Sequence, residues 1–274
     1  MPARFAWASG CLLCIVGCSD DNDRKPARGE GHPAAVLTAD VPDIDAACTG
    51  TDGPSVIVFT AENLWQHTGN PAARDAILGM CATHGFSVIA THDRDIFESE
   101  RLATTDVVVF AATSGNVLDE LSRAHLEAWM RAGGGLVGLH TADFTENAWD
   151  YYSNAIGATL EAHAPGVWSV DITIETSHPI VAHLPARWAQ TDEIHVFAER
   201  PELTPVTILL AADESTLAAD YPEELRVGYH PIAWAHELYG GRVFFSCLGH
   251  AADSYEDPLH VEMIARAITW TAGP

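Results

Sequence analysis

Four histidines lie where an α/β fold places its active site: His67, His140, His163 and His250. His140 follows directly on the apolar run 136–139, and His250 follows the run 243–249. In open α/β sheets, ligands bind in the crevice beyond the carboxyl ends of the strands. An imidazole there can relay protons near neutral pH or bind a metal. The spacing therefore predicts a site and leaves its reaction open.

A parallel sheet is needed to position these histidines, and the apolar pattern predicts one. Continuous apolar runs at 56–59, 87–90, 107–111 and 136–139 are typical of buried parallel strands. Two amphipathic helices separate the runs, with inward-facing residues Ala73, Ala76, Ile77, Met80 and Cys81 in the first and Leu118, Leu121, Leu126, Trp129 and Met130 in the second. This alternation predicts an α/β fold with a doubly wound, mainly parallel sheet and right-handed crossovers.

The second half of the chain is less regular. Alternation over 167–174 predicts a strand with one buried face. The segments 232–238 and 243–248, on either side of Tyr239-Gly240-Gly241, predict a β-hairpin. A last helix is expected to begin at Asp257, a capping residue followed by proline, and to bury Val261, Ile264, Ala265 and Ile268.

The N-terminus predicts export. After Arg4, residues 5–16 form an apolar run that is too short to span a bilayer but typical of a signal peptide. The run ends Ile15-Val16-Gly17-Cys18, which resembles a bacterial lipobox, so we expect residues 1–17 to be removed and Cys18 to carry lipid. Ser19 fits retention at the outer membrane, facing the periplasm. An ordinary secretory signal with an incidental cysteine is the alternative.

Composition divides the remaining chain and limits its partners. Residues 18–53 lack periodicity and are expected to form a flexible tether, with the folded domain at 54–274. Lys+Arg 14 against Asp+Glu 38 gives a net charge of −24, which excludes the basic cluster that nucleic-acid binding requires. The surface is expected to hold solvated acidic residues, among them Asp192, Asp220, Glu223 and Glu224.

Three cysteines, Cys48, Cys81 and Cys247, lie after the leader in a chain that we expect to enter an oxidising compartment. Three thiols allow at most one disulfide and leave one over. Cys81 on an apolar helix face and Cys247 in a buried strand are both expected to be small core hydrophobes. Whether Cys48 forms a disulfide stays open.

Eight blocks of sequence agree in order and spacing with one known family: 58–59 with His67, 106–110, 131–140, 149–152 with 156–158, 191–193, 230–234, 240–244, and 248–250 with Ser254-Tyr255. Over residues 56–272 the chain resembles the ThuA-like (trehalose-utilisation) family, a branch of the class I glutamine amidotransferase-like, flavodoxin-like fold. One departure is Ala162-His163-Ala164-Pro165, where the family more often has Gly-His-Pro.

The resemblance implies a site without the ancestral nucleophile. Amidotransferases of this fold carry a cysteine at a sharp strand-to-helix turn, and this chain has His140 at that position. Neither Cys81 nor Cys247 falls at such a turn. A thiolate that attacks the glutamine amide is therefore missing, and we expect no glutaminase activity.

Two chemistries remain for the histidine-rich site. His140 and His250 can act as an acid–base pair, with Glu193, which the resemblance adds, as a base or as a partner for an imidazole. Alternatively, a divalent metal such as zinc is held by residues drawn from His140, His163, His250 and Glu193. These candidate ligands are scattered along the chain and form no known metal-binding motif, so the sequence alone does not establish a metal site. His236 and Asp143 are weaker candidates for functional residues of this site.

Substrate contacts are expected from His67 and His163 at the rim of the site. Trp149, Tyr152 and Trp234 are candidates to offer flat faces to sugar rings, although packing in the core is the favoured interpretation of aromatic residues of this kind. The leading hypothesis is an exported, lipid-anchored enzyme of trehalose or keto-sugar metabolism, such as a lyase, isomerase or hydrolase. The alternative is a non-catalytic sugar-binding module tethered to the cell envelope. A residual amidase or peptidase is disfavoured because no cysteine or serine nucleophile is in place.

Overall fold

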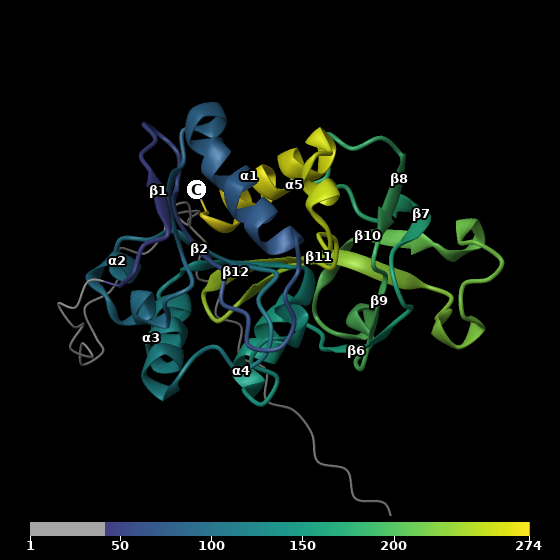
Figure 1. Ribbon diagram of the computed structural model, residues 1–274, viewed down its shortest axis with the longest axis horizontal. Helices are drawn as coiled ribbons and strands as arrows, with labels where there is room; N and C mark the ends of the chain where they lie inside the picture. Colours follow the sequence, from purple (N-terminus) through teal and green to yellow (C-terminus); the bar gives the residue numbers. More distant parts are fainter. Residues whose placement is uncertain (1–41, 274) are drawn as a thin grey trace, which may run out of the picture.

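A ten-stranded mixed sheet runs through the centre of the protein (Figure 1). The computed structural model describes residues 42–273. The strand order is β1-β3-β2-β4-β5-β12-β11-β10-β7-β8, and a separate two-stranded sheet pairs β6 with β9. The strands are β1 (Ala46–Cys48), β2 (Ser55–Phe59), β3 (Ser87–Thr91), β4 (Val107–Ala111), β5 (Gly135–Leu139), β6 (Leu160–His163), β7 (Trp168–Ile174), β8 (Arg187–Asp192), β9 (His195–Phe197), β10 (Thr207–Asp213), β11 (His230–Leu238) and β12 (Gly241–Ser246).

Helices cover both faces of the sheet. Helices α1 (Gly69–His84) and α5 (Pro258–Thr271) lie on one face, and α3 (Glu120–Arg131) and α4 (Asp150–Ile156) lie on the other (Figure 1). The remaining helices are short: α2 (Glu100–Ala103) and the 3-10 turns η1 (Arg94–Glu98), η2 (His140–Phe144), η3 (Pro201–Leu203), η4 (Glu214–Thr216), η5 (Glu223–Leu225) and η6 (Ala252–Tyr255).

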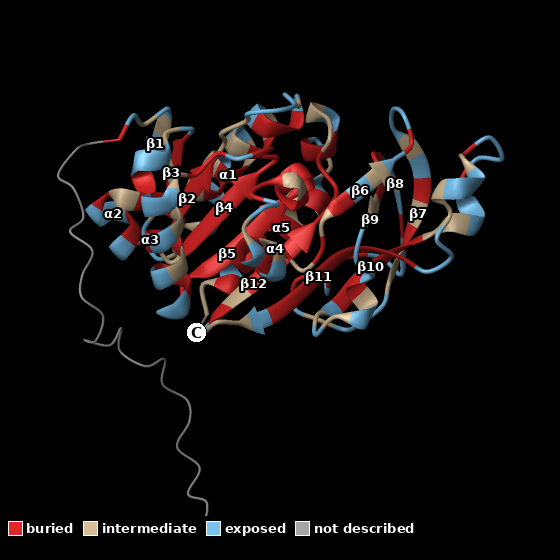
Figure 2. Cartoon of the chain, turned by 90° about the horizontal axis from the view of Figure 1, so that it is seen from below, coloured by how far each residue is buried: buried red, intermediate tan, exposed pale blue. Residues whose placement is uncertain are grey.

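The parallel strands β3-β2-β4-β5-β12 form the part of the sheet that positions the histidines. Their order in the chain is 2-1-3-4-5, the flavodoxin-like arrangement in which ligands bind at the carboxyl edge. Strands β2, β4 and β5 are almost completely buried (Figure 2), because helices cover both faces and their residues are apolar throughout. The predicted α/β, doubly wound class is confirmed.

Antiparallel strands extend the sheet beyond β12. The predicted hairpin is β11–β12, which pairs Leu238 with Gly241 across a two-residue turn. Both turn residues, Tyr239 and Gly240, have positive φ values (58° and 95°), as a type I′ turn requires. Strand β7 is the predicted strand at 167–174, whereas β8 and β10, which flank it, were not anticipated.

Helix boundaries follow their capping residues. The carboxylate of Asp257 accepts a hydrogen bond from the backbone N–H of Leu259 at 2.8 Å, as expected for the start of α5. Helix α1 ends at Gly85, which has the left-handed C-cap conformation. One expected core position is wrong: Leu121 lies in the first turn of α3 and is 46% exposed, whereas Leu118, before the helix, is buried.

The folded part begins earlier than the sequence indicated. Strand β1 lies within the segment assigned to the tether, and it pairs antiparallel with β3 at the edge of the sheet. A disulfide joins Cys48 of β1 to Cys81 of α1. Cys81 is therefore not the free core hydrophobe that was expected, whereas Cys247 is free and buried as predicted.

The leader 1–17 and the lipidation candidate Cys18 lie outside the described residues. Within residues 42–273, no helix is long and apolar enough to cross a membrane.

Candidate active site

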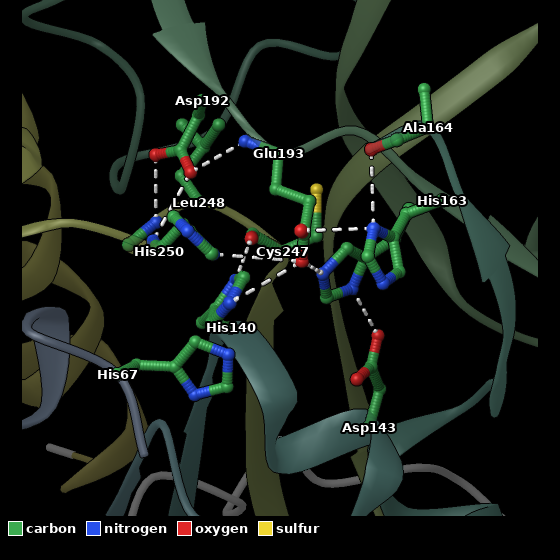
Figure 3. Close-up of polar contacts among 12 residues, drawn as sticks. His67, His140, Asp143, His163, Ala164, Asp192, Glu193, Cys247, Leu248 and His250 are labelled. Carbon is green, nitrogen blue, oxygen red and sulfur yellow. Dashed lines mark hydrogen bonds and ion pairs between the residues drawn. The ribbon is translucent and has the colours of Figure 1, made fainter. Parts of the chain in front are cut away.

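Histidines from three different loops meet at the carboxyl edge of the parallel strands (Figure 3). His140 follows β5, His250 follows β12, and His67 lies between β2 and α1. The ring centroids of His140 and His250 are 5.3 Å apart, and His67 lies 4.7 Å from His140 and 5.2 Å from His250. The structure thus brings together the two histidines for which strand-end positions predicted a shared site, and it places His67, which was expected at the rim of that site, beside both.

His140 occupies a strained turn that fixes its ring. Its φ of 50° is in the left-handed region, which costs energy for a residue with a side chain. Its Nδ1 lies 2.9 Å from the carbonyl oxygen of Cys247, so this nitrogen carries the proton and donates it. The other nitrogen, Nε2, is buried and has no hydrogen-bond partner. Burial holds the pKa of His140 well below its usual range, so the ring is neutral with a free lone pair.

Glu193 lies at the centre of the cluster. Its Oε2 is 3.7 Å from Nε2 of His140 and 3.6 Å from Nδ1 of His250, and its Oε1 is 2.9 Å from Nδ1 of His163. Burial alone would raise the pKa of Glu193, but its close contacts with His195 and His250, together with the charges of the neighbouring imidazoles, outweigh burial and lower it. The same contact with Glu193 raises the pKa of His250. Glu193 is therefore held as a carboxylate.

His195 and Asp143 form a buried pair behind Glu193. Nδ1 of His195 lies 2.7 Å from Oδ2 of Asp143, and Nε2 of His195 lies 3.4 Å from Oε2 of Glu193. Burial disfavours a charged His195, but the charge and hydrogen bond of Asp143, together with the bond to Glu193, raise its pKa to about 10. A buried imidazolium therefore lies between two carboxylates.

Sequence reasoning missed His195 and ranked Asp143 low. The signal available was the spacing: Glu193 and His195 are two residues apart in an extended segment, where alternate side chains point the same way.

Asp192 was expected to be a solvated charge, and this is wrong. Its side chain is buried, and its two oxygens accept four hydrogen bonds. Oδ1 accepts from the backbone N–H groups of Glu193 (2.8 Å) and His250 (3.1 Å). Oδ2 accepts from Gly249 N–H and from the Ser254 hydroxyl, both at 2.8 Å. Asp192 thus fixes the turn that carries His250 relative to Glu193.

Gly249 makes this turn possible. Its φ is +124°, and a Cβ at this position would lie 2.3 Å from the hydroxyl oxygen of Tyr255. Only glycine can adopt this φ without strain and leave room for the Tyr255 hydroxyl.

Four donor atoms, one each from His67, His140, Glu193 and His250, lie within 4.8 Å of one another. Donors around tetrahedral zinc lie roughly 3.3 Å apart, since each Zn–N bond is about 2.0–2.1 Å. The separations of 3.7 Å and 3.6 Å between Glu193 and His140 or His250 are close to that value. Nε2 of His140 and Nδ1 of His250 are buried without a hydrogen-bond partner, whereas Nδ1 of His67 lies 3.8 Å from a carboxylate oxygen of Glu62. The donor set therefore fits a divalent metal.

This set differs from the one that the sequence suggested. His163 was among the expected metal ligands, but the donor group contains His67 in its place. Burial and the neighbouring charge of His250 lower the pKa of His67, which keeps it available as a neutral donor. The His163 side chain is 40% exposed and reaches only the outer oxygen of Glu193.

A cleft of about 620 Å³ opens onto this cluster. His67, His163, Glu193 and His250 form one end of it, and the loop after β2 forms a wall with Asn63, Leu64 and Trp65. This volume lies within the usual range of small-molecule sites, about 300–1,000 Å³. The cleft gives a small ligand access to both Glu193 and His163.

Residues 55–271 match the family model ThuA, described as trehalose utilisation. The chain belongs to the ThuA family. None of the curated proteins compared matches this ThuA protein in sequence.

Solved structures show the same fold. A ThuA-like protein from Bacteroides uniformis is 19% identical, with a TM-score of 0.69 over 82% of this chain and 94% of that one. A ThuA-like protein from Parabacteroides merdae is 18% identical, with a TM-score of 0.61 over 81% and 91% of the two chains. Alpha-L-fucosidase isoenzyme 2 from Paenibacillus thiaminolyticus has a TM-score of 0.53 at 13% identity, over 81% of this chain and 33% of its own.

The strand-to-helix turn after β5 in this ThuA protein carries an imidazole and no thiol. That residue is His140, between β5 and η2. The one free cysteine in the described residues, Cys247, is fully buried, and burial raises its pKa well above the usual range. A thiol in that state is a poor nucleophile.

The aromatic residues expected to bind sugar lie elsewhere in the ThuA domain. Trp234 is completely buried and donates to the carbonyl of Ile156 at 2.7 Å, and Tyr152 is buried with its hydroxyl donating to Ala142 at 3.1 Å. Both therefore belong to the core and present no face to a ligand. Trp149 is half-buried and does not line the cleft.

The aromatic residue at the cleft is Trp65, which sequence reasoning did not single out. His236, another weak candidate, is also buried, with its Nε2 2.8 Å from the carbonyl of Ala155.

Proposed function

We propose that this ThuA protein is a metal-dependent enzyme that performs acid–base chemistry on a carbohydrate, next to a sugar carbonyl. One observation carries the proposal: Nε2 of His140 and Nδ1 of His250, both buried without hydrogen-bond partners, lie 3.7 Å and 3.6 Å from Oε2 of Glu193, and a donor atom of His67 lies within 4.8 Å of this group. Buried polar atoms without partners are costly and rare. A bound cation would give both of these nitrogens a partner, and three imidazole nitrogens with one carboxylate are a donor set that zinc accepts.

His67, His140, His250 and Glu193 would hold the cation, whose charge would stabilise an oxygen that becomes negative. His163 lies outside this group and lines the cleft. Its Nδ1 lies 2.9 Å from Oε1 of Glu193 and 3.2 Å from the carbonyl of Ala164, so Nδ1 carries the proton. Nε2 then keeps its lone pair and can act as a base.

The proposed step removes a proton from the carbon next to a sugar carbonyl. The C–H bond breaks, its electron pair forms a C=C bond, and the carbonyl electrons move onto oxygen, which becomes an enolate. The proton passes to Nε2 of His163. Where the deprotonated carbon carries a hydroxyl group, its proton moves to the enolate oxygen, the former carbonyl carbon takes the proton back from His163, and a carbonyl forms at the neighbouring carbon, which is isomerisation. Where the next carbon carries a leaving group, the enolate re-forms the carbonyl, the leaving group departs with the proton from His163, and the product is an unsaturated ketone, which is elimination. Neither outcome needs the nucleophile that the site lacks.

A carbohydrate substrate is supported by the family's description, trehalose utilisation, and by the cleft of about 620 Å³ at the cluster. A non-catalytic sugar-binding module is the competing function. It would need no base and no group of convergent imidazoles, so the cluster favours an enzyme.

We also propose export and a lipid anchor at Cys18. The leader sequence is the first support. The disulfide between Cys48 and Cys81 is the second, because disulfides persist in oxidising compartments such as the periplasm. The intact mass of protein extracted from membranes would test the anchor. A product cleaved at another position, without lipid on Cys18, would contradict it.

The decisive experiment measures metal and turnover together. The purified protein is expected to contain about one zinc or related ion per chain, and to convert a member of a panel of glucosides and 3-keto-glucosides only without chelator. The variants His140→Ala and His250→Ala should lose both metal and turnover while keeping their circular dichroism spectra. His92→Ala, which removes an exposed histidine away from the site, is the matched control.

Two results would contradict the proposal in different ways. Turnover that survives chelation would remove the metal from the mechanism. Tight binding of a sugar without conversion of any member of the panel would identify the binding module instead.

A further inference from the structure

A second hollow, of about 480 Å³, lies at the edge of the sheet opposite to the histidine cluster, and we call it the α4 hollow. Its walls are drawn from the end of α4 and the residues after it (153–159), the connection between β9 and β10 (199–206) and the end of β11 with its turn (236–239). Leu238 pairs with Gly241, where β12 begins, whereas the cluster lies where β12 ends. None of the residues that line the α4 hollow also lines the cleft.

His236 brings an unused hydrogen-bond acceptor to the wall of the α4 hollow, although its side chain is only 7% exposed. Trp234 and His236 are two positions apart in β11, so both point to the face of the sheet that α4 covers. Nε2 of His236 lies 2.8 Å from the carbonyl oxygen of Ala155 in α4 and therefore carries the proton. Nδ1 keeps its lone pair and has no hydrogen-bond partner. Burial lowers the pKa of His236, which keeps the ring neutral.

A hydroxyl group from α4 is in the same condition. Ser153 also lines the α4 hollow, and its Oγ is buried without a hydrogen-bond partner. Buried polar atoms without partners are rare, and here two of them belong to the wall of one hollow. A ligand hydroxyl that enters between α4 and β11 could donate to Nδ1 of His236 and accept from the Ser153 hydroxyl.

The walls of the α4 hollow are held in place without a ligand. The backbone N–H of Thr159 donates to Oε2 of Glu199 at 3.0 Å, and the N–H of Ala198 donates to the carbonyl of Thr159 at 2.9 Å. The Tyr239 ring is stacked on Tyr151, with centroids 4.1 Å apart. A ligand therefore finds a largely formed site, which keeps the entropic cost of binding low.

The lining of the α4 hollow defines the class of ligand. Leu203, Val206 and Leu238 give it apolar walls, and Leu203 is 78% exposed. Glu199 is the one residue with an acidic side chain in the lining, and no Lys or Arg is present there. An anion would find no cation in this lining, on a protein whose net charge is −24. The lining thus favours an uncharged molecule.

We propose that the α4 hollow is a second ligand site, separate from the histidine cluster, for a small uncharged molecule with an apolar body and a hydroxyl group. The apolar body would lie against Leu203, Val206 and Leu238, and the hydroxyl group would bind His236 and Ser153. A volume of about 480 Å³ is within the usual range of small-molecule sites. The proposal goes beyond the proposed function and does not depend on a metal or on turnover.

Titration of the ¹⁵N-labelled protein with phenol, followed by the NMR shifts of its backbone amides, locates the site and measures its Kd. We expect shifts at 157–159 and 203–206, with a Kd of about 1 mM or lower. Toluene has the same ring without the hydroxyl group and should bind at least about fivefold more weakly, because it leaves Nδ1 of His236 unpaired. Benzoate should bind at least about tenfold more weakly than phenol.

Two variants test the residues of the site. In His236→Gln the amide nitrogen can still donate to Ala155, but no acceptor remains at the position of Nδ1, so the preference for phenol over toluene should fall below about twofold. Asn154→Trp, at an exposed position of the wall, should weaken binding of both probes at least about tenfold. Asn116→Trp, at an exposed position outside the α4 hollow, is the matched control and should leave the Kd of phenol unchanged.

Four results would overturn the proposal or its ligand class. Absence of shifts with phenol, or shifts only at cleft residues such as Trp65, would remove the site. An unchanged Kd in Asn154→Trp would do the same, and this exposed change tests the site even if His236→Gln does not fold. Toluene that binds as tightly as phenol would exclude the role of the hydroxyl group, and benzoate that binds equally well would exclude the uncharged class.

Discussion

Nδ1 of His163 lies 2.9 Å from Oε1 of Glu193, on the side of the carboxylate that faces away from the buried imidazoles. The other oxygen, Oε2, faces His140, His195 and His250. One carboxylate therefore connects a half-exposed histidine at the cleft to the buried donor group. The arrangement separates a residue that can move a proton from residues that can hold a cation.

Replacing His163 should separate turnover from metal binding. In His163→Gln the side-chain amide can still donate to Glu193, but it cannot accept a proton at neutral pH. We expect metal content to stay near the wild-type value and kcat to fall by about 10²–10⁴, the usual contribution of a general base. Metal analysis and steady-state kinetics of the same preparation check this. Loss of metal in this variant would show that His163 is a ligand instead.

Asp192→Asn should be strongly destabilising although it changes a single atom. Both oxygens of Asp192 accept two hydrogen bonds each, so an amide nitrogen in either position would face N–H or O–H donors. Breaking charge-assisted bonds in a buried position costs about 2–4 kcal/mol of unfolding free energy. Urea denaturation measures this cost. Asp220→Asn, at an exposed position, should change stability by less than about 0.5 kcal/mol.

The sequence could predict those parts of the site that the parallel sheet positions. His140 and His250 follow neighbouring strands in register, so the end of each apolar run was enough to place them together. Glu193 lies in the short connection between β8 and β9, and His195 is the first residue of β9, in the irregular half of the chain. Their convergence depends on long-range pairing that no local pattern specifies. For Glu193 only the family resemblance supplied the position.

Burial explains the other differences between the residues expected at the site and those that the structure places there. Trp234 lies in the continuous apolar strand β11 and is enclosed on both faces, whereas Trp65 lies in a loop of mixed polarity and is exposed. An aromatic residue's type does not distinguish these two outcomes. Likewise, the residue type of Asp192 does not show whether its carboxylate is solvated or buried. The four hydrogen-bond donors that surround it come from segments far apart in the sequence, at Glu193 and at 249–254.

Glutamine should not be hydrolysed. The turn after β5 carries His140, and burial raises the pKa of Cys247, the one free thiol among the described residues. Ammonia release from glutamine is expected to equal that of a boiled control, and the metal-loaded protein should behave in the same way. Release that exceeds the control and disappears in Cys247→Ser would show that the buried thiol is active after all.

The disulfide should contribute substantially to stability. Cys48 and Cys81 are separated by 33 positions. Closing a loop of that length lowers the entropy of the unfolded chain, which in the loop-entropy model raises the free energy of unfolding by about 4 kcal/mol at 25 °C. Reductant should therefore lower the melting temperature of the wild type. The double variant Cys48→Ser/Cys81→Ser should melt at that lower temperature with or without reductant. A wild type that is insensitive to reductant, with thiols shown to be reduced, would contradict a stabilising role.

Acid sensitivity should depend in part on Glu214. Its carboxylate accepts hydrogen bonds from the backbone of Val227 (2.7 Å) and Gly228 (3.0 Å) and contacts Nδ1 of His230 at 2.8 Å. Burial alone would raise the pKa of Glu214, but these bonds, with His230 first, outweigh burial and lower it. The unfolded chain therefore takes up this proton at a higher pH than the folded protein does. The stabilisation is complete above about pH 5 and is lost as the pH falls through the folded pKa.

Glu214→Gln should accordingly have a lower unfolding midpoint than the wild type at neutral pH. The difference between the two proteins should shrink as the pH falls below about 4.5, because the wild-type carboxylate then becomes protonated as well. Urea denaturation at a series of pH values measures this difference. Glu224→Gln, at an exposed position in the neighbouring η5 turn, is the control and should follow the wild-type curve. A gap between Glu214→Gln and the wild type that is constant across this pH range would show that the lost stabilisation comes from packing and not from the charge of Glu214.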